Sequence, residues 1–259
     1  AAAAKAVVIR NDGGRVTRAS SLIHTGRDVR GAGDRVLAVA LTKIGFTGSI
    51  EQVDYIVATG YGRVSLPYAH MTMTEIACHA RGAHSSWPKT RFIIDIGGQD
   101  SKAIKVDEKG RVTAFVMNDK CAAGSGRFLE VMADVLETDI EDFGEISLQS
   151  KDPCPMSSIC TVFAESEMVA LRAERKPIED LVAGIHYSIA RRVAKMAAPL
   201  GFVDDIVFTG GVAKNVGMRR ALEEEIGRKI VSLTEDPQLN GALGAALFAE
   251  EVWRRENGQ

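Results

Sequence analysis

The sequence predicts an α/β protein that consists of two lobes in tandem. A strand, a turn and a returning strand over residues 5–22 are followed by alternating helices and strands, and the same order recurs from residue 91. Between these two repeats, Ser85–Lys89 breaks the regular pattern with a Trp-Pro pair. We therefore expect a first lobe over residues 1–88 and a second lobe over residues 89–240.

Turn signals separate the elements of the first lobe. Asn11–Gly14 is a strong turn signal between two β-rich runs, and Gly45 and Gly82 fit the ends of two helices. The elements expected here are strands over 5–9, 15–22 and 55–59, and helices over 29–44 and 74–81.

The second lobe begins with three strands and continues with helices that alternate with strands. Residues 178–200 form a long amphipathic pattern, and Gly201 fits its end. The elements expected are strands over 91–95, 102–106, 112–117, 206–209 and 229–232, and helices over 122–136, 161–175, 178–200, 217–227 and 241–254.

Composition excludes several classes of protein. Of the 259 residues, 46% are hydrophobic and 25% are charged, an ordinary globular mixture that argues against disorder. The 32 basic and 34 acidic residues give a net charge of -2, so no basic face for nucleic acid is expected. No apolar stretch approaches the length of a membrane span, and no signal peptide is visible. We expect a cytoplasmic protein without a membrane or nucleic-acid partner.

A candidate phosphate loop follows the first strand of the second lobe. The strand ends in Asp95, and Gly97, Gly98 and Gln99 follow it. Glycines let backbone N–H groups approach phosphate oxygens, and an aspartate at a strand end can hold Mg²⁺ through water. Gln99 could orient an attacking water. The alternative is a tight turn between two strands that is capped by Asp95.

A second candidate nucleotide loop follows the strand at 206–209. The strand enters Gly210 and Gly211, and a helix begins shortly after them. That arrangement suits a phosphate or ribose near a helix N-terminus, and the alternative is an ordinary strand-to-helix loop. The sequence contains neither the GxxxxGK[ST] pattern nor the GxGxxG dinucleotide pattern.

Two of the four cysteines precede predicted helices. Cys121 and Cys160 stand 39 residues apart, whereas Cys78 and Cys154 lack this setting and are expected to be free thiols. A helix N-terminus favours the thiolate that binds metals. Iron–sulfur clusters usually need four cysteine thiolates, so two chains would have to share one cluster. The alternative is a pair of buried structural cysteines.

Seven segments together resemble one family of ATPases. They resemble the ATP-dependent activators of 2-hydroxyacyl-CoA dehydratases and the related ATPase subunits of benzoyl-CoA reductase. The segments run in family order and cover most of the chain between residues 55 and 247. They are Ala58–Arg63, Thr74–Gly82, Asp95–Asp100, Asn118–Gly124, Cys160–Glu165, Thr209–Asn215 and Gly241–Leu247.

This resemblance implies a two-lobed α/β fold of the actin/hexokinase/Hsp70-like (ASKHA, ribonuclease H-like) type around an ATP cleft, with the first lobe completed by a helix over 241–259. It also implies ATP or ADP, Mg²⁺ and one 4Fe–4S cluster that is shared by a dimer, with Cys121 and Cys160 of each subunit as ligands. Asp95 and Gln99 would be the catalytic residues. The expected nucleotide-binding residues are Gly97, Gly98, Gly124, Gly126, Gly210, Gly211, Val212 and Asn215.

The implied function is ATP-dependent electron transfer. ATP hydrolysis would drive one electron at a time from the cluster, itself reduced by a ferredoxin or flavodoxin, to a CoA-ester enzyme. The stretches Tyr61–His70 and Glu75–Arg81 favour benzoyl-CoA reductase as that partner, with a 2-hydroxyacyl-CoA dehydratase as the alternative. The dimer would be a homodimer or a heterodimer with a sister subunit of the same fold. A small-molecule kinase or a nucleotide-binding regulator, each without iron, is the competing interpretation.

The sequence departs from this family at its start. The family's first phosphate loop, a strand followed by Asp-x-Gly-Ser/Thr, would stand just before Ala4–Val8, where the printed sequence has only alanines. We expect either that the sequence is truncated there or that its first residues are not native. Whether this sequence is competent for ATP hydrolysis depends on that loop.

Overall fold

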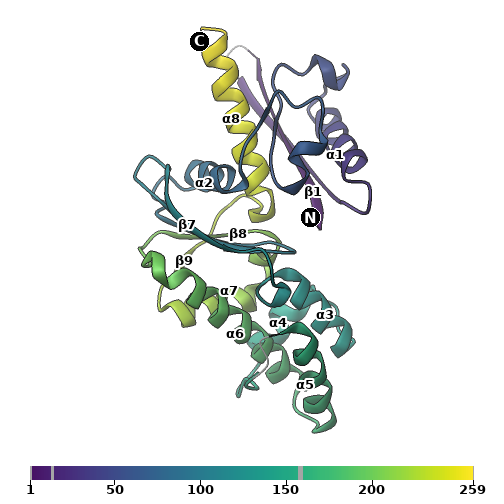
Figure 1. The fold of residues 1–259 in the computed structure, drawn as a ribbon, viewed down its shortest axis with the longest axis vertical. Coiled ribbons are helices and arrows are strands. Elements are labelled where there is room, and N and C mark those ends of the chain that lie inside the picture. Colours follow the sequence, from purple (N-terminus) through teal and green to yellow (C-terminus); the bar gives the residue numbers. More distant parts are fainter. Residues whose placement is uncertain (1, 13–14, 157–159, 259) are drawn as a thin grey trace. The chain divides into compact units, whose positions relative to one another are not determined.

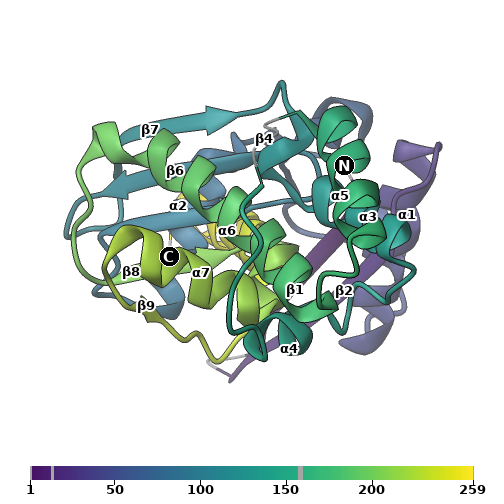
Figure 2. The same cartoon turned by 90° about the horizontal axis from the view of Figure 1, so that it is seen from below.

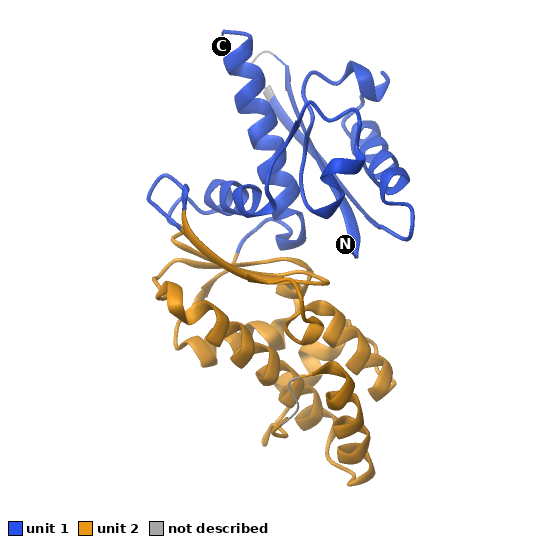
Figure 3. Cartoon of the chain, in the orientation of Figure 1, with its two compact units in different colours: residues 1–89, 106–112, 233–259 blue, residues 90–105, 113–232 orange. Residues whose placement is uncertain are grey.

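The computed structural model describes residues 2–12, 15–156 and 160–258. These residues form two compact units (Figure 3). The first unit contains Ala1–Lys89, Val106–Val112 and Leu233–Gln259, and the second contains Thr90–Lys105 and Thr113–Ser232. The order of the elements along the chain can be followed in Figure 1. No helix in the described ranges is both long and apolar enough to cross a membrane.

A β-hairpin and one helix form the beginning of the first unit. Strands β1 (Ala3–Asp12) and β2 (Arg15–His24) pair antiparallel, and α1 (Val29–Lys43) packs against both. Asp28 caps α1 by accepting a hydrogen bond from the Gly31 N–H at 2.8 Å. These elements match the predicted strands and helix, although residues 13–14 of the predicted turn lie outside the described residues. The predicted strand at 55–59 is short: β3 is Val57–Ala58, paired parallel with β4 (Met71–Thr72).

Two helices in the first unit approach each other closely. α2 spans Glu75–Ser86 and α8 spans Asn240–Glu256. A Cβ atom on Gly82 would lie 2.2 Å from the carbonyl oxygen of Asn240, and one on Gly244 would lie 1.8 Å from that of Cys78. The prediction that Gly82 ends the helix is therefore wrong. This glycine lies inside α2 because only hydrogen fits at the contact with α8.

The turn between two strands of the sheet belongs to the first unit. Residues 106–112 lie against α2, where the ring Nε2 of His84 is 3.2 Å from the carbonyl oxygen of Glu108. Gly110 has φ +71°, and a Cβ atom there would stand 2.5 Å from the His84 ring. The sequence-based division of the lobes assigned this turn to the second lobe.

A five-stranded sheet organises the second unit. Its order is β7 (Val112–Asn118), β6 (Ser101–Val106), β5 (Phe92–Ile96), β8 (Ile206–Thr209) and β9 (Ile230–Val231). Strand β5 is buried along its whole length, antiparallel to β6 and parallel to β8. This matches the continuous apolar run that predicted a buried strand. The helices near this sheet are seen from below in Figure 2.

The helices of the second unit supply its core. Alternate residues of β5 (Phe92, Ile94 and Ile96) pack in one cluster with apolar side chains of these helices. The helices are α3 (Gly126–Leu136), α4 (Phe143–Leu148), α5 (Thr161–Ala173), α6 (Ile178–Ala197) and α7 (Val216–Ile226).

Two helix predictions of the second unit need correction, and one helix was missed. The helix expected over 122–136 is a 3-10 turn followed by α3, because Ser125 between them is extended with φ -135°. Of the helix expected over 178–200, the part up to Ala197 is α6, and a 3-10 turn that contains Pro199 follows it. Helix α4 was not predicted.

The 3-10 turns are η1 (Ile50–Gln52), η2 (Tyr61–Ser65), η3 (Ala122–Gly124), η4 (Ala198–Leu200), η5 (Gly211–Lys214) and η6 (Pro237–Leu239).

Candidate nucleotide and metal site

The two predicted nucleotide loops lie next to each other in the second unit. Strands β5 and β8 run parallel, and Asp95 pairs in register with Thr209 at their carboxyl ends. Gly97 and Gly98 follow β5, and Gly210 follows β8, so both loops leave the sheet at the same edge. Ligands of parallel α/β sheets bind at this edge.

Gly210 holds the two loops in contact. Its φ is +91°, and a Cβ atom there would lie 2.2 Å from the carbonyl oxygen of Ile96 and 3.0 Å from Oδ1 of Asp95. Both the backbone conformation and the lack of space require glycine. Gly211 begins the 3-10 turn η5, in which Val212 is buried.

Asp95 lies in a buried network of polar groups. Thr209 donates its hydroxyl to Asp95 Oδ1 at 2.8 Å, and Lys102 Nζ lies 3.3 Å from Asp95 Oδ2. The same ammonium contacts Asp100 Oδ1 at 2.8 Å, and all three side chains of this Asp95–Lys102–Asp100 cluster are less than 10% exposed. The turn itself is closed by the Gly97 N–H, which donates to the carbonyl oxygen of Asp100 at 2.9 Å. Asp95 is thus held by residues of the two neighbouring strands.

The loop after β5 offers backbone donors. In the described part of the chain, no residue accepts a hydrogen bond from the N–H of Gly98 or of Gln99. The Gln99 side chain is exposed, unlike Asp95. Two neighbouring N–H groups with an exposed amide beside them can bind phosphate oxygens and contact an attacking water.

Helix α3 begins directly on this loop. The N–H of Gly126 donates to the Gly97 carbonyl at 2.8 Å, and the N–H of Arg127 donates to the Gly98 carbonyl at 2.9 Å. A Cβ atom on Gly126 would lie 3.2 Å from both the Gly97 oxygen and Val212 Cγ2. A side chain at this position would thus be in tight contact with both loops. Gly124 is also buried, and its nearest contact would be Arg192 Cδ at 3.3 Å.

Asn215 ends the second loop and caps α7. Its Oδ1 accepts from the Met218 N–H at 2.8 Å, and its Nδ2 lies 3.1 Å from Nε2 of His186. Both ends of the amide thus make contacts within the second unit. These contacts position the start of α7 at the carboxyl end of β8.

The four cysteines fall into two groups. Cys121 is half-buried and Cys160 is exposed, whereas Cys78 and Cys154 are buried. Burial raises the pKa of the Cys78 thiol to about 11 and also raises that of Cys154, so both remain protonated thiols at neutral pH. The expectation that these two are free thiols is consistent with that environment.

Cys121 and Cys160 occupy different kinds of helix start. Cys160 is the N-cap of α5, as predicted, whereas Cys121 precedes only the short turn η3. Ser157–Ile159, which precede Cys160, lie outside the described residues. Across the described ranges, no group of three or more Cys, His, Asp or Glu side chains could hold a metal ion.

Sequence reasoning missed Lys102 and Thr209 as neighbours of Asp95. Their identities carry a weak signal, because a lysine and a threonine in buried strands need polar partners. Only the strand register, which places Asp95 opposite Lys102 and Thr209, identifies that partner.

The fold is that of the actin/hexokinase/Hsp70-like class of ATPases. The chain belongs to the BadF/BadG/BcrA/BcrD ATPase family, whose model matches residues 1–249. It is 46% identical over 247 residues to the 2-hydroxyisocaproyl-CoA dehydratase activator of Clostridioides difficile, covering 95% of this chain and 91% of the relative. This confirms the fold class and the family resemblance.

One solved structure and one further relative complete the comparison. The crystal structure of the (R)-2-hydroxyglutaryl-CoA dehydratase component A of Acidaminococcus fermentans superposes with a TM-score of 0.88 at 42% identity, covering 96% of this chain and 98% of that one. A benzoyl-CoA reductase subunit of Thauera aromatica is 36% identical over 201 residues, covering 76% of this chain and 71% of the relative. The higher identity to the dehydratase activator favours our alternative interpretation over the benzoyl-CoA reductase one.

Proposed function

We propose that this protein is the ATP-dependent activator of a 2-hydroxyacyl-CoA dehydratase. The observation that supports it is the combination, within one unit, of two nucleotide loops and two accessible cysteines. The family membership supports ATP as the nucleotide, and the relatives named as dehydratase activators support the partner. We expect the protein to act in the cytoplasm, with a reduced ferredoxin or flavodoxin as electron source.

The residues of the second unit suit distinct tasks in this function. The N–H groups of Gly98 and Gln99 would bind phosphate oxygens, and the Gln99 amide would hold the attacking water. Asp95, positioned by Thr209 and Lys102, would contact Mg²⁺ through water. The loop Gly210–Val212 would carry the adenosine, and Asn215 would position it by capping α7.

The accessible cysteines fit one half of a cluster site. Cys121 and Cys160 would each contribute a thiolate, and a second subunit would contribute the other two. A bound 4Fe–4S cluster would supply a low-potential electron. The helix N-terminus at Cys160 favours negative charge on the ligands, an effect of about 0.3–1 kcal/mol at an exposed helix end. The second subunit is a further copy of this chain or a sister subunit of the same fold.

Iron content and activation of a dehydratase test this proposal. We expect about two irons per chain in a dimer-sized particle after anaerobic purification. Cys121→Ser and Cys160→Ser should both lose the iron, whereas the control Cys154→Ala should keep it. The iron-containing protein should activate a 2-hydroxyacyl-CoA dehydratase component with ATP and not with ADP.

Two results would contradict the proposal. Absence of iron, with Cys121 and Cys160 freely alkylated, would indicate a kinase or a nucleotide-binding regulator. ATP-dependent reduction of a benzoyl-CoA reductase component without activation of any dehydratase would keep the cluster but replace the partner.

A further inference from the structure

Lys102 joins the two ends of the candidate phosphate loop. The loop of residues 97–99 lies between Asp95, in strand β5, and Asp100, which directly precedes β6. Lys102 Nζ lies 3.3 Å from Asp95 Oδ2 and 2.8 Å from Asp100 Oδ1. A single ammonium group thus contacts a carboxylate on either side of the loop.

The hairpin of β5 and β6 places the ammonium there. Asp95 stands opposite Lys102 in the antiparallel register, so the two side chains lie on the same face of the sheet. The Gly97 N–H donates to the Asp100 carbonyl at 2.9 Å, and a Cβ atom on Gly97 would lie 2.9 Å from Asp100 Oδ1. The Asp100 side chain therefore rests directly against the first glycine of the loop.

The charges of this cluster are buried. The side chains of Asp95, Lys102 and Asp100 are 3%, 2% and 9% exposed. Thr209 also donates to Asp95 Oδ1 at 2.8 Å, so Asp95 is fixed from both neighbouring strands. Two carboxylates that contact the same nitrogen atom repel each other, and burial removes the water that would screen them. They therefore depend on a positive charge between them.

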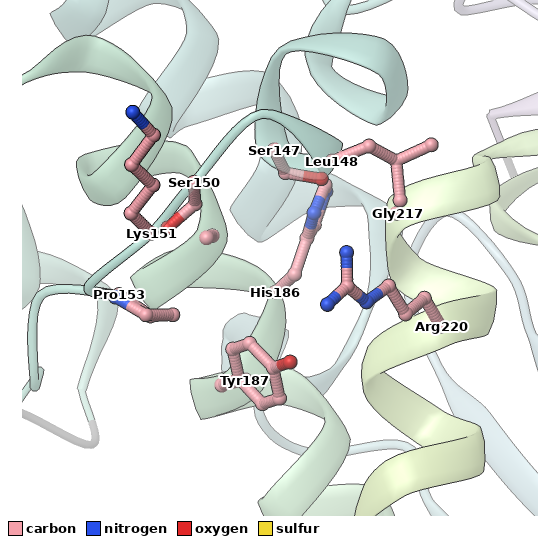
Figure 4. Close-up of a pocket in the computed structure, with 10 residues that line it drawn as sticks. Ser147, Leu148, Ser150, Lys151, Pro153, His186, Tyr187, Gly217 and Arg220 are labelled. Carbon is pink, nitrogen blue, oxygen red and sulfur yellow. The ribbon is translucent and has the colours of Figure 1, made fainter.

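Charged side chains at a cavity elsewhere in the second unit have a different setting. This cavity lies between the end of α4, α6 and the start of α7 (Figure 4) and is lined by Lys151 and Arg220, which are both exposed. Its His186 is buried, and burial lowers the pKa of the imidazole to about 3, so the ring is uncharged at neutral pH. Water compensates the exposed charges there, whereas the carboxylates beside Lys102 depend on its ammonium.

An ammonium between two carboxylates can act as a bound monovalent cation does. The ammonium group and K⁺ carry the same charge, and protein oxygen atoms can replace the water around either of them. The ammonium of Lys102 is attached covalently, so it is present in every molecule whatever the salt in solution.

We propose that Lys102 is the built-in monovalent cation of the nucleotide site. Its ammonium holds Asp95 and Asp100 at the two ends of the phosphate loop, so the loop keeps its shape without K⁺ or Na⁺ from solution. Lys102 is thus a positioning residue. Its effect on the nucleotide rests on the proposed function, whereas the equivalence of its ammonium and a free cation does not.

The stability of Lys102→Ala in two salts tests this equivalence. Alanine removes the ammonium and opens space between the two carboxylates. Urea denaturation is compared in KCl and in N-methylglucamine chloride at equal ionic strength, because the organic cation is too large to enter. We expect wild type to have the same midpoint in both salts. Lys102→Ala should have a higher midpoint in KCl, because K⁺ binds the folded state.

Two variants serve as controls. Lys102→Met also removes the ammonium, but its side chain fills the space, so its midpoint should be the same in both salts. Lys105→Ala removes a half-buried lysine of the same strand, whose Nζ donates to the uncharged Leu200 carbonyl at 3.0 Å. Its midpoint should also not depend on the salt.

The affinity for Mg-ADP connects the cation to the nucleotide. Calorimetric titration in the same two salts should give one affinity for wild type. Lys102→Ala should bind Mg-ADP about 10-fold or more weakly in N-methylglucamine chloride than in KCl, as is typical when a residue that orients a metal contact is lost. A wild type that does not bind Mg-ADP would contradict the proposed function, and the urea midpoints would still decide the role of Lys102.

Two results would overturn the proposal. If Lys102→Ala gains no stability from KCl, or stays unfolded in both salts, K⁺ cannot take the place of the ammonium. If wild type binds Mg-ADP only in KCl, the site still requires a cation from solution, and this measurement needs no variant.

Discussion

Lys102 and Asp95 form an ion pair in the interior of the second unit. Lys102 Nζ lies 3.3 Å from Asp95 Oδ2, and the two side chains are 2% and 3% exposed. The ammonium also contacts Asp100 at 2.8 Å, so one lysine serves two buried carboxylates. Removal of this lysine would take a compensating positive charge away from both carboxylates.

Replacement of Lys102 should destabilise the protein strongly. We expect Lys102→Met to lower the free energy of unfolding by about 3–5 kcal/mol, because it removes one partner of a buried ion pair. Urea denaturation measures this loss. The control is Lys229→Met, which removes an exposed lysine from its pair with Glu223 and should cost at most about 1 kcal/mol. Equal losses in both variants would contradict a buried ionic network around Asp95.

A side chain at Gly210 should disturb the second nucleotide loop. Gly210→Ala adds a Cβ atom 2.2 Å from the Ile96 oxygen at a φ of +91°, so the backbone must move. Gly45→Ala is the control for the conformation alone, since Gly45 has φ +74° and nothing within 4 Å of the added atom. We expect Gly210→Ala to lose about 1–3 kcal/mol more than the control in urea denaturation. A smaller or equal loss would show that the loop adapts to the side chain.

Gln99 should affect hydrolysis and not folding. Its side chain is exposed, so Gln99→Ala should leave the unfolding midpoint unchanged. If Gln99 orients the attacking water, the ATP hydrolysis rate should fall about 10²-fold or more, while ADP affinity stays the same. The control is Gln149→Ala, a second exposed glutamine far along the chain. A parallel loss of ADP affinity would indicate a role in nucleotide binding instead.

His186 should make stability depend on pH below neutrality. Its pKa is about 3 in the folded protein and about 6.5 in an unfolded chain, so the unfolded state binds the extra proton between these values. The free energy of unfolding should therefore fall, as pH drops from about 6.5 toward 3, by up to about 1.4 kcal/mol per pH unit.

A variant without the imidazole isolates this contribution. His186→Gln should remove the contribution of the imidazole to the change in the free energy of unfolding between pH 7 and pH 5. Urea denaturation at both pH values measures this change. The control Gln149→Ala, which changes an exposed side chain without an ionisable group, should leave the same slope as the wild type. An unchanged slope in His186→Gln would mean that the imidazole takes up its proton in the native state as readily as in the unfolded chain.

The strands of the site and its two glycine loops could be predicted from the sequence alone. The apolar runs at β5 and β8 and the glycine pairs that follow them are local patterns that can be seen in a few consecutive residues, and Gly210 also has the positive φ that favours glycine. The segments shared with the ATPase family added the nucleotide and its class of chemistry. The position of Cys160 at a helix start was equally local.

Only the tertiary structure decided which residues these local elements bring together. The pattern around Gly82 indicates a helix end, yet this glycine lies within α2 because α8 packs against it. Lys102 has the pattern of an ordinary strand residue, yet the register of β6 against β5 pairs it with Asp95. The surroundings of the buried His186 depend on α4, a helix that no pattern indicated, and on the cap of α7 at Asn215. Each of these contacts joins segments separated in the sequence, so their energies arise from packing and burial that local propensity does not contain.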